Sequence, residues 1–270
     1  MHAETRDLDF TSAFSDREMT KLRQYKVIFV PGFLSDAWSD TGLYFYPQLK
    51  LLNQAGVESS VLKFRSGASS KKAGQALAQA VLQSDKPVVL ITHSKGGLDA
   101  LIGLVDYPQL LDHVKGWIQL QGPIHGTKLV PLLLAHYPES ASYIGMGLEM
   151  AGADLNVALD FDPRIRELYL KKNATAIAAI TTAIPTLSVG TYLLPAPNGL
   201  PNTAFYIPKI LMDQTGGLSD GLVSPSDSKL PGSNHLIIPR LDHNGLILPM
   251  QNAGTDLHVF LFRILLHKMQ

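Results

Sequence analysis

A serine between small residues stands at Ser94, in the segment Thr92-His93-Ser94-Lys95-Gly96-Gly97. The apolar segment 87–91 precedes it, and the helix-like segment 98–104 follows. A buried strand that turns sharply into a helix through such a serine is the G-x-S-x-G pattern of a nucleophile elbow, here with Thr92 at the first glycine position. Free N–H groups at the start of the helix would favour negative charge beside the hydroxyl. We therefore predict that Ser94 is a nucleophile; the alternative is an ordinary strand-to-helix turn.

A serine hydroxyl needs a base to take its proton, and the base needs an acid to orient it. In folds built around this turn, the order along the chain is serine, acid and histidine. Asp220 lies in the glycine-rich segment 216–223, and His243 lies in a loop after the strand-like segment 235–238. Since both follow Ser94 in that order, we predict Asp220 as the orienting acid and His243 as the base.

Both predicted partners of Ser94 have rivals in the sequence. Asp213, Asp227 and Asp242 are the rival acids, and His258 is the rival base. Asp242 is the weakest of these, because side chains of sequence neighbours usually point apart. His258 falls within a helix-like segment and reads as a core or surface residue.

Acyl transfer also needs N–H donors for the oxyanion that forms on the carbonyl oxygen. One donor is the backbone N–H after the nucleophile, which belongs to Lys95, and the other comes from the loop after the first core strand. That loop begins Pro31-Gly32-Phe33, so we predict Phe33 as the second donor. The alternative is a glycine turn that merely ends a strand.

These residues must be positioned by a sheet, and the sequence predicts an α/β fold with a mostly parallel sheet. Continuous apolar strands separated by helices are typical of parallel sheets covered on both faces. The predicted strands are 26–30, 57–64, 87–91, 115–120, 186–192 and 235–238, and the predicted helices include 70–83, the segment after Ser94 and 256–267.

The segment 128–185 interrupts this alternation, because it is mostly helical in pattern. We predict that it is a helical cap over the carboxyl ends of the strands, where open α/β sheets bind ligands. The alternative is a peripheral helical layer without a role in binding. The length of 270 residues fits one domain, 1–270, that contains this insertion.

The composition narrows the function further. Twenty-three basic residues balance 23 acidic residues, so we expect no nucleic-acid partner. The chain has no cysteine and no metal-binding histidine pair, and we expect neither a metal nor another cofactor. Without a signal-like or membrane-spanning segment, the sequence predicts a soluble protein and favours the cytoplasm, although a secreted chain that had lost its signal would read the same.

Segments 27–33, 92–97 and 217–223, together with Asp242-His243, resemble the α/β-hydrolase lipases. The resemblance is greatest to the bacterial triacylglycerol lipases and to the lipase-like inositol deacylases of GPI-anchor remodelling, and segment 121–127 shares it. It spans 26–248 and is weakest in the predicted cap. It implies the α/β-hydrolase fold and ester hydrolysis through an acyl-enzyme. The implied roles are Ser94 as nucleophile, His243 as base, Asp220 as orienting acid, and Phe33 and Lys95 as oxyanion donors.

Two positions depart from the pattern of these lipases. Thr92 replaces the first glycine of the elbow, a change that packing can absorb. Many bacterial lipases bind calcium through an acid two residues after the catalytic histidine, but Gly245 stands there, so calcium is not expected.

The sequence thus predicts a serine esterase or lipase for carboxylic esters with apolar acyl chains, in transient contact with a lipid interface. Two alternatives remain: an acyltransferase with the same three residues, and a scaffold that binds without turnover. The sequence leaves the oligomeric state open.

Overall fold

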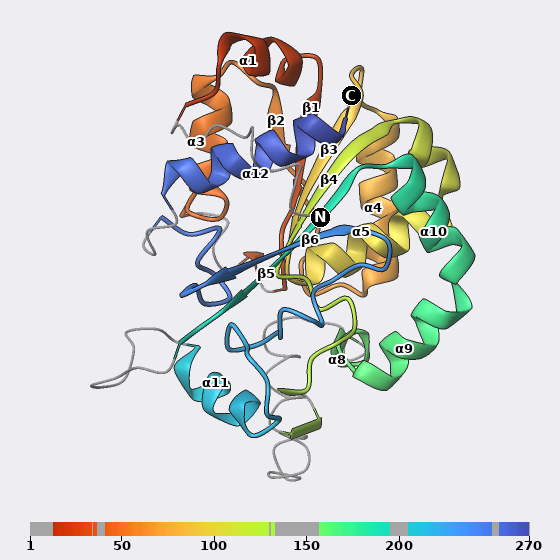
Figure 1. The fold of residues 1–270 in the computed structure, drawn as a ribbon. Helices are drawn as coiled ribbons and strands as arrows, with labels where there is room; N and C mark the ends of the chain where they lie inside the picture. Colours follow the sequence, from red (N-terminus) through yellow and green to blue (C-terminus); the bar gives the residue numbers. More distant parts are fainter. Residues whose placement is uncertain are drawn as a thin grey trace.

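The protein is built around a six-stranded parallel sheet, shown in Figure 1 for the computed structural model. The structure describes residues 13–33, 35–36, 41–129, 131–132, 157–194, 205–249 and 254–269. The strand order is β2-β1-β3-β4-β5-β6. The strands are β1 (Lys26–Val30), β2 (Ser59–Val61), β3 (Val88–His93), β4 (Val114–Leu120), β5 (Thr186–Tyr192) and β6 (Asn234–Pro239). The α/β prediction is therefore confirmed.

Helices cover both faces of the sheet, and each face has its own apolar core. In Figure 1, α1, α3 and α12 lie on one side of the sheet and α4, α5 and α10 on the other. The first core joins the strands to residues such as Leu52 and Phe262, and the second joins them to residues such as Leu101 and Ile180. The helices are α1 (Asp16–Leu22), α3 (Tyr46–Gln54), α4 (Ser70–Leu82), α5 (Lys95–Asp106), α8 (Val157–Asp160), α9 (Pro163–Lys172), α10 (Ala174–Ala183), α11 (Tyr206–Asp213) and α12 (Thr255–Lys268), with a 3-10 turn at Pro108–Asp112.

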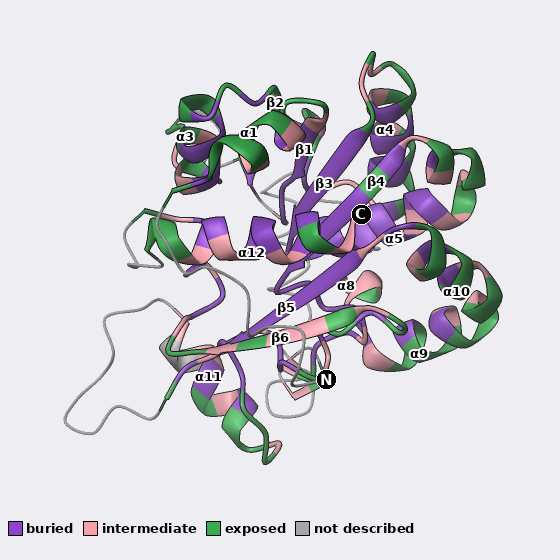
Figure 2. Ribbon diagram, turned by 45° about the horizontal axis from the view of Figure 1, so that its top comes forward, coloured by how far each residue is buried: buried purple, intermediate pink, exposed green. Residues whose placement is uncertain are grey.

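The strands differ in burial according to their place in the sheet. All six residues of the central β3 are buried, as the apolar segment 87–91 predicts for its first four residues. The edge strand β6 is mostly intermediate or exposed (Figure 2). The other edge strand, β2, has only three residues, whereas the predicted strand spanned 57–64. The register with β1 covers only Ser59 to Val61, so the predicted strand was too long at both ends.

The predicted cap, 128–185, falls partly on residues that the structure describes. Helix α10 contributes Ile177 and Ile180 to the core on the α5 face, and α9 contributes Leu170. These two helices therefore take part in the helical layer on that face of the sheet. Residues 130 and 133–156 lie outside the described part, and the cap remains a prediction.

The first and last described helices are tied together. Ser15 and Glu18 form a capping box that starts α1. Arg263 of α12 donates from Nε to Glu18 Oε1 at 2.7 Å, and Lys21 Nζ donates to the carbonyl of Leu266 at 2.9 Å. Among the described helices, none is long and apolar enough to cross a membrane.

Candidate active site

Ser94 occupies a strained turn between β3 and α5. Its φ of 52° and ψ of −128° lie in a region that non-glycine residues rarely adopt. A side chain at Gly96 could not be accommodated, because a Cβ there would lie 2.3 Å from the carbonyl oxygen of Val30. The glycine lets the start of α5 approach the end of β1. This is the close strand-to-helix turn that the sequence predicts around Ser94.

Thr92, the departure from the elbow pattern, fits because its hydroxyl has a partner. The indole Nε1 of Trp117, on the neighbouring strand β4, donates to Thr92 Oγ1 at 3.0 Å. Both residues are fully buried. A glycine would leave this buried indole N–H without its acceptor, and unpaired buried donors are costly.

Ser94, His243 and Asp220 form one continuous hydrogen-bonded series. The Nε2 atom of His243 lies 2.8 Å from Ser94 Oγ, and its Nδ1 atom lies 2.9 Å from Asp220 Oδ2. Because a carboxylate only accepts, Nδ1 carries the hydrogen, which leaves the lone pair of Nε2 facing the serine hydroxyl. Three residues far apart in sequence thus have the arrangement in which a histidine can take a proton from serine.

The carboxylate of Asp220 is held on both oxygens. Its Oδ1 accepts from the backbone N–H groups of Leu222 at 2.9 Å and Val223 at 2.8 Å. Its Oδ2 faces His243 and, at 3.3 Å, the amide nitrogen of Gln121. In addition, the N–H of His243 donates to the carbonyl of Asp220 at 3.0 Å. The glycine-rich loop therefore fixes the acid and the histidine relative to each other.

The rival residues have other partners. Asp213 pairs with Lys209 at 2.7 Å, Asp227 accepts from Ser224 at 2.7 Å, and Asp242 accepts from the N–H of Asn244 at 2.9 Å. His258 lies in α12 beside Gln48, with 3.3 Å between Nδ1 and the amide nitrogen. Within the described part of the chain, no cluster of three or more histidine or acidic residues could hold a metal ion.

The two predicted oxyanion donors belong to segments that meet at Ser94. Phe33 follows Gly32, and a Cβ added at Gly32 would lie 2.9 Å from the Cβ of Ser94. Lys95 is the first residue of α5, so its N–H has no partner within the helix. Its side chain is fully buried and forms an ion pair with Asp99 at 2.7 Å. Burial raises the pKa of Asp99 to about 6, although Lys95 opposes this rise.

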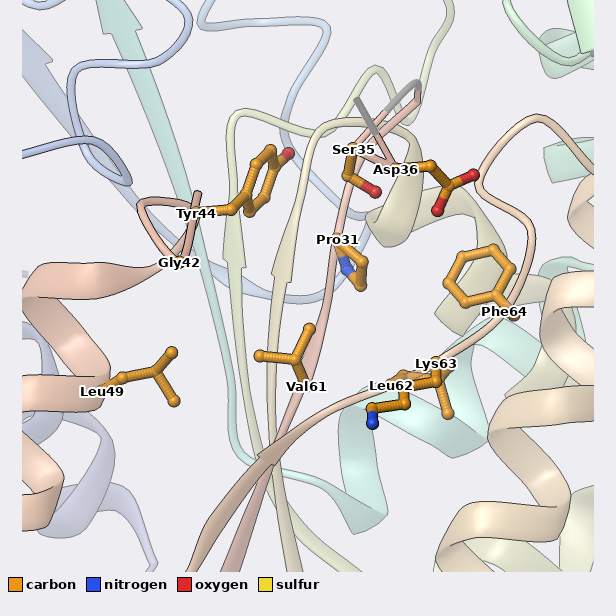
Figure 3. A pocket seen from close by; sticks show the side chains of 10 residues that line it. All are labelled: Pro31, Ser35, Asp36, Gly42, Tyr44, Leu49, Val61, Leu62, Lys63 and Phe64. Carbon is orange, nitrogen blue, oxygen red and sulfur yellow. The ribbon is translucent and has the colours of Figure 1, made fainter. Parts of the chain in front are cut away.

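A cavity of about 500 Å³ opens beside the loop after β1. In Figure 3, Tyr44 and Leu49 lie on one side of it and Phe64 on the other, with Pro31 and Val61 between them. The cavity therefore lies at the carboxyl ends of β1 and β2, where open α/β sheets bind ligands. Its lining is mainly apolar, which suits a hydrocarbon group.

Three polar residues around the site were not predicted from the sequence: Gln121, Tyr44 and His93. Gln121 faces the carboxylate of Asp220, and Tyr44 Oη lies 2.6 Å from Nδ1 of His93. His93 stands inside the elbow segment, but its type there indicates no role. For Tyr44 the sequence carries no signal, because its partner lies 49 residues away.

Comparison with solved structures places the fold among known enzymes. No protein-family model matches the sequence, and no curated protein matches it. Similar structures include a mature Bacillus licheniformis lipase, BlEst2, at a TM-score of 0.69 and 17% identity over 89% of this chain and 92% of the lipase. The metagenomic carboxyl esterase MGS0156 is similar at a TM-score of 0.67 and 17% identity, over 93% of this chain and 76% of the esterase. EstA from Clostridium botulinum is similar at a TM-score of 0.55 and 16% identity, over 95% of this chain and 91% of EstA.

The chain therefore has the α/β-hydrolase fold seen in bacterial lipases and esterases. At these identities, the likeness defines the fold. The resemblance to the deacylases of GPI-anchor remodelling remains a prediction from the sequence.

Proposed function

We propose that the protein is a serine hydrolase that cleaves carboxylic esters with apolar acyl groups. The observation that carries the proposal is the series from Ser94 Oγ through both nitrogens of His243 to Asp220, at 2.8 Å and 2.9 Å. The lipases and esterases that share the fold support the same class of reaction.

In this proposal, Ser94 Oγ attacks the ester carbonyl carbon while His243 Nε2 takes its proton. The resulting oxyanion is bound by the backbone N–H groups of Phe33 and Lys95. When the bond to the leaving alcohol breaks, the proton passes from His243 to the alcohol oxygen, and the acyl group stays on Ser94. Water then attacks the acyl-enzyme through the same base, which releases the acid and restores Ser94. Asp220 holds the ring and stabilises the imidazolium formed in both halves.

A fluorophosphonate probe tests the nucleophile. We expect the probe to label Ser94, and Ser94→Ala to lose both the label and about 10⁴-fold or more of the p-nitrophenyl ester hydrolysis. The labelled peptide is identified by mass spectrometry. Equal labelling of the Ser94→Ala variant would contradict the proposal. Free acid as the main product in the presence of an added alcohol identifies water as the acyl acceptor.

The cavity beside β1 supports an apolar acyl group. If it holds the acyl chain, each methylene adds about 0.8 kcal/mol, or roughly fourfold in kcat/KM, until the cavity is filled. A series of p-nitrophenyl esters from acetate upward measures this slope. In Val61→Phe, which narrows the cavity, the preferred chain becomes shorter, whereas the exposed Leu82→Phe keeps the parent profile. Rates indifferent to chain length would contradict the apolar acyl group.

A further inference from the structure

Two side chains outside the proposed catalytic series connect its two sides. The backbone N–H of Gly32 lies 2.9 Å from Tyr44 Oη, and this hydroxyl lies 2.6 Å from His93 Nδ1. On the other side of the ring, His93 Nε2 lies 2.7 Å from the backbone carbonyl oxygen of His243. The contacts therefore run from the loop after β1, through the elbow, to the loop that carries His243.

The direction of each hydrogen bond follows from the chemistry of its ends. A carbonyl oxygen only accepts, so Nε2 of His93 carries the hydrogen. Burial lowers the pKa of His93 to about 3, so its ring is neutral at ordinary pH and Nδ1 has a lone pair. The hydroxyl of Tyr44 therefore donates to Nδ1, and it accepts from the N–H of Gly32. All three bonds point the same way, an arrangement in which each bond polarises and strengthens the next.

We propose that Tyr44 and His93 are positioning residues that hold the loop of the oxyanion donor Phe33 in register with the base His243. The proposal rests on the proposed ester hydrolysis. One end of the series is the amide of Gly32, directly before Phe33, and the other end is the backbone of His243 itself. A neutral, fully paired His93 adds no charge beside the base, so the two residues act on geometry alone.

The rings of Tyr44 and His93 also pack against neighbouring rings, so a variant that keeps the ring can test the hydrogen bonds alone. The Tyr44 ring meets that of Phe45 edge-on with centroids 5.0 Å apart, and the rings of His93 and His243 lie 5.0 Å apart. Tyr44→Phe keeps the ring but removes the hydroxyl, which leaves the N–H of Gly32 and Nδ1 of His93 unpaired. We expect kcat for p-nitrophenyl esters to fall roughly tenfold, with KM changed less than about twofold.

Tyr46→Phe is the matched control, because it removes the same hydroxyl from a partly exposed tyrosine two residues away. It should leave kcat unchanged. Assays are run well below the unfolding temperature of each variant, so that a loss of stability does not reduce the rate.

Two amide substitutions at His93 separate the two ends of the series. His93→Gln can place its amide N–H near the former Nε2 and keep the bond to the carbonyl of His243. His93→Asn can place its amide oxygen near the former Nδ1 and keep the bond from Tyr44. We expect both variants to lower kcat, and Tyr44→Phe combined with His93→Gln to be no worse than the poorer single variant, because both break the same link.

The result that overturns the proposal is Tyr44→Phe with the kcat of the parent protein, or effects of Tyr44→Phe and His93→Gln that multiply. Nitrogen NMR of the histidine rings gives a readout that does not depend on turnover. We expect His93 to carry its hydrogen on Nε2 alone between pH 5 and 9, with the Nδ1 shift changed in Tyr44→Phe; a hydrogen on Nδ1 contradicts the series. Failure of the parent protein to label with fluorophosphonate contradicts the proposed function instead, so the two failures are distinguishable.

Discussion

Gln121 is a buried amide whose nitrogen lies within hydrogen-bond distance of three acceptors. These are the carbonyl oxygen of Asp242 at 2.7 Å, Asp220 Oδ2 at 3.3 Å and the hydroxyl of Thr191. The residue has a φ of 53°, so the chain bends directly after β4, where the side chain of Gln121 meets the acid. Gln121 thus joins the end of β4 to the two loops that carry Asp220 and His243.

Gln121→Leu should lower kcat for p-nitrophenyl esters about tenfold, because the carboxylate of Asp220 loses a donor and a buried carbonyl is left unpaired. Gln119→Leu is the matched control, two residues earlier and on β4 itself. Gln119 is also buried, but its amide atoms have no hydrogen-bond partner among the described residues, so its replacement should leave kcat close to that of the parent. Equal losses in the two variants would mean that Gln121 acts only through packing.

At the residue scale, the order of residue types along the chain is the signal that the sequence carries. Ser94, Asp220 and His243 were predicted from their order and from the strands before them, and the structure brings all three into contact. Gln121 and Tyr44 could not be predicted, because their contacts depend on how separate loops pack. Contacts between loops that are distant in sequence leave no local sequence pattern.

At the element scale, helices α4 and α5 approach each other through glycine. A Cβ added at Gly74 would lie 2.8 Å from the backbone nitrogen of Gly103, and one added at Gly103 would lie 3.0 Å from the carbonyl oxygen of Gly74. Since the nearest atoms are backbone, neither helix can relieve the contact by a side-chain rotation. These two glycines therefore set the spacing of the layer that contains the helix after Ser94.

Gly74→Ala should destabilise the protein by about 2 kcal/mol, because it forces α4 away from α5. Urea unfolding measures the change. Gly217→Ala is the control: a Cβ there meets no atom within 4 Å, so we expect a change below about 0.5 kcal/mol. A Gly74→Ala variant as stable as Gly217→Ala would show that the helices separate without cost.

The elements themselves were well predicted where burial is complete. Strands β1, β3, β4 and β5 are mostly buried, and each lies close to its predicted range. The predicted strand 57–64 was too long, since pairing at the edge stops at Val61. The sequence did not show that α9 and α10 share the core on the α5 face, because apolar helical spacing does not name the surface that it packs against.

At the scale of the whole molecule, buried titratable groups make stability depend on pH. Burial lowers the pKa of His93 from 6.5 to about 3 and that of His258 from 6.5 to about 4. Below pH 6.5 the unfolded chain takes up protons at both residues while the native protein does not, so these two groups reduce stability as the pH falls. Asp99 opposes this trend: its pKa is raised from 3.8 to about 6, so the native protein takes up its proton first.

We therefore expect stability to fall between pH 6.5 and about 4, and below pH 6 to fall less steeply than the two histidines alone would make it, because Asp99 opposes them. His258→Gln removes one proton from the uptake that accompanies unfolding. The slope of the unfolding free energy against pH should then fall by about 1.4 kcal/mol per pH unit. Urea unfolding from pH 4.5 to 8 measures this slope, and His267→Gln, at an exposed position on the same helix, is the control. An unchanged slope in His258→Gln would contradict a contribution of buried His258 to the pH dependence of stability.

The contact between Glu18 and Arg263 has a consequence for the order of folding. It joins residues 245 positions apart, and closing so long a loop in an unstructured chain costs about 5 kcal/mol. A parallel sheet that forms first removes most of that cost, because it holds α1 and α12 on the same face. We expect α1 to dock late during folding and to leave early during unfolding. Loss of the Glu18 carboxylate should then speed unfolding while refolding keeps its rate.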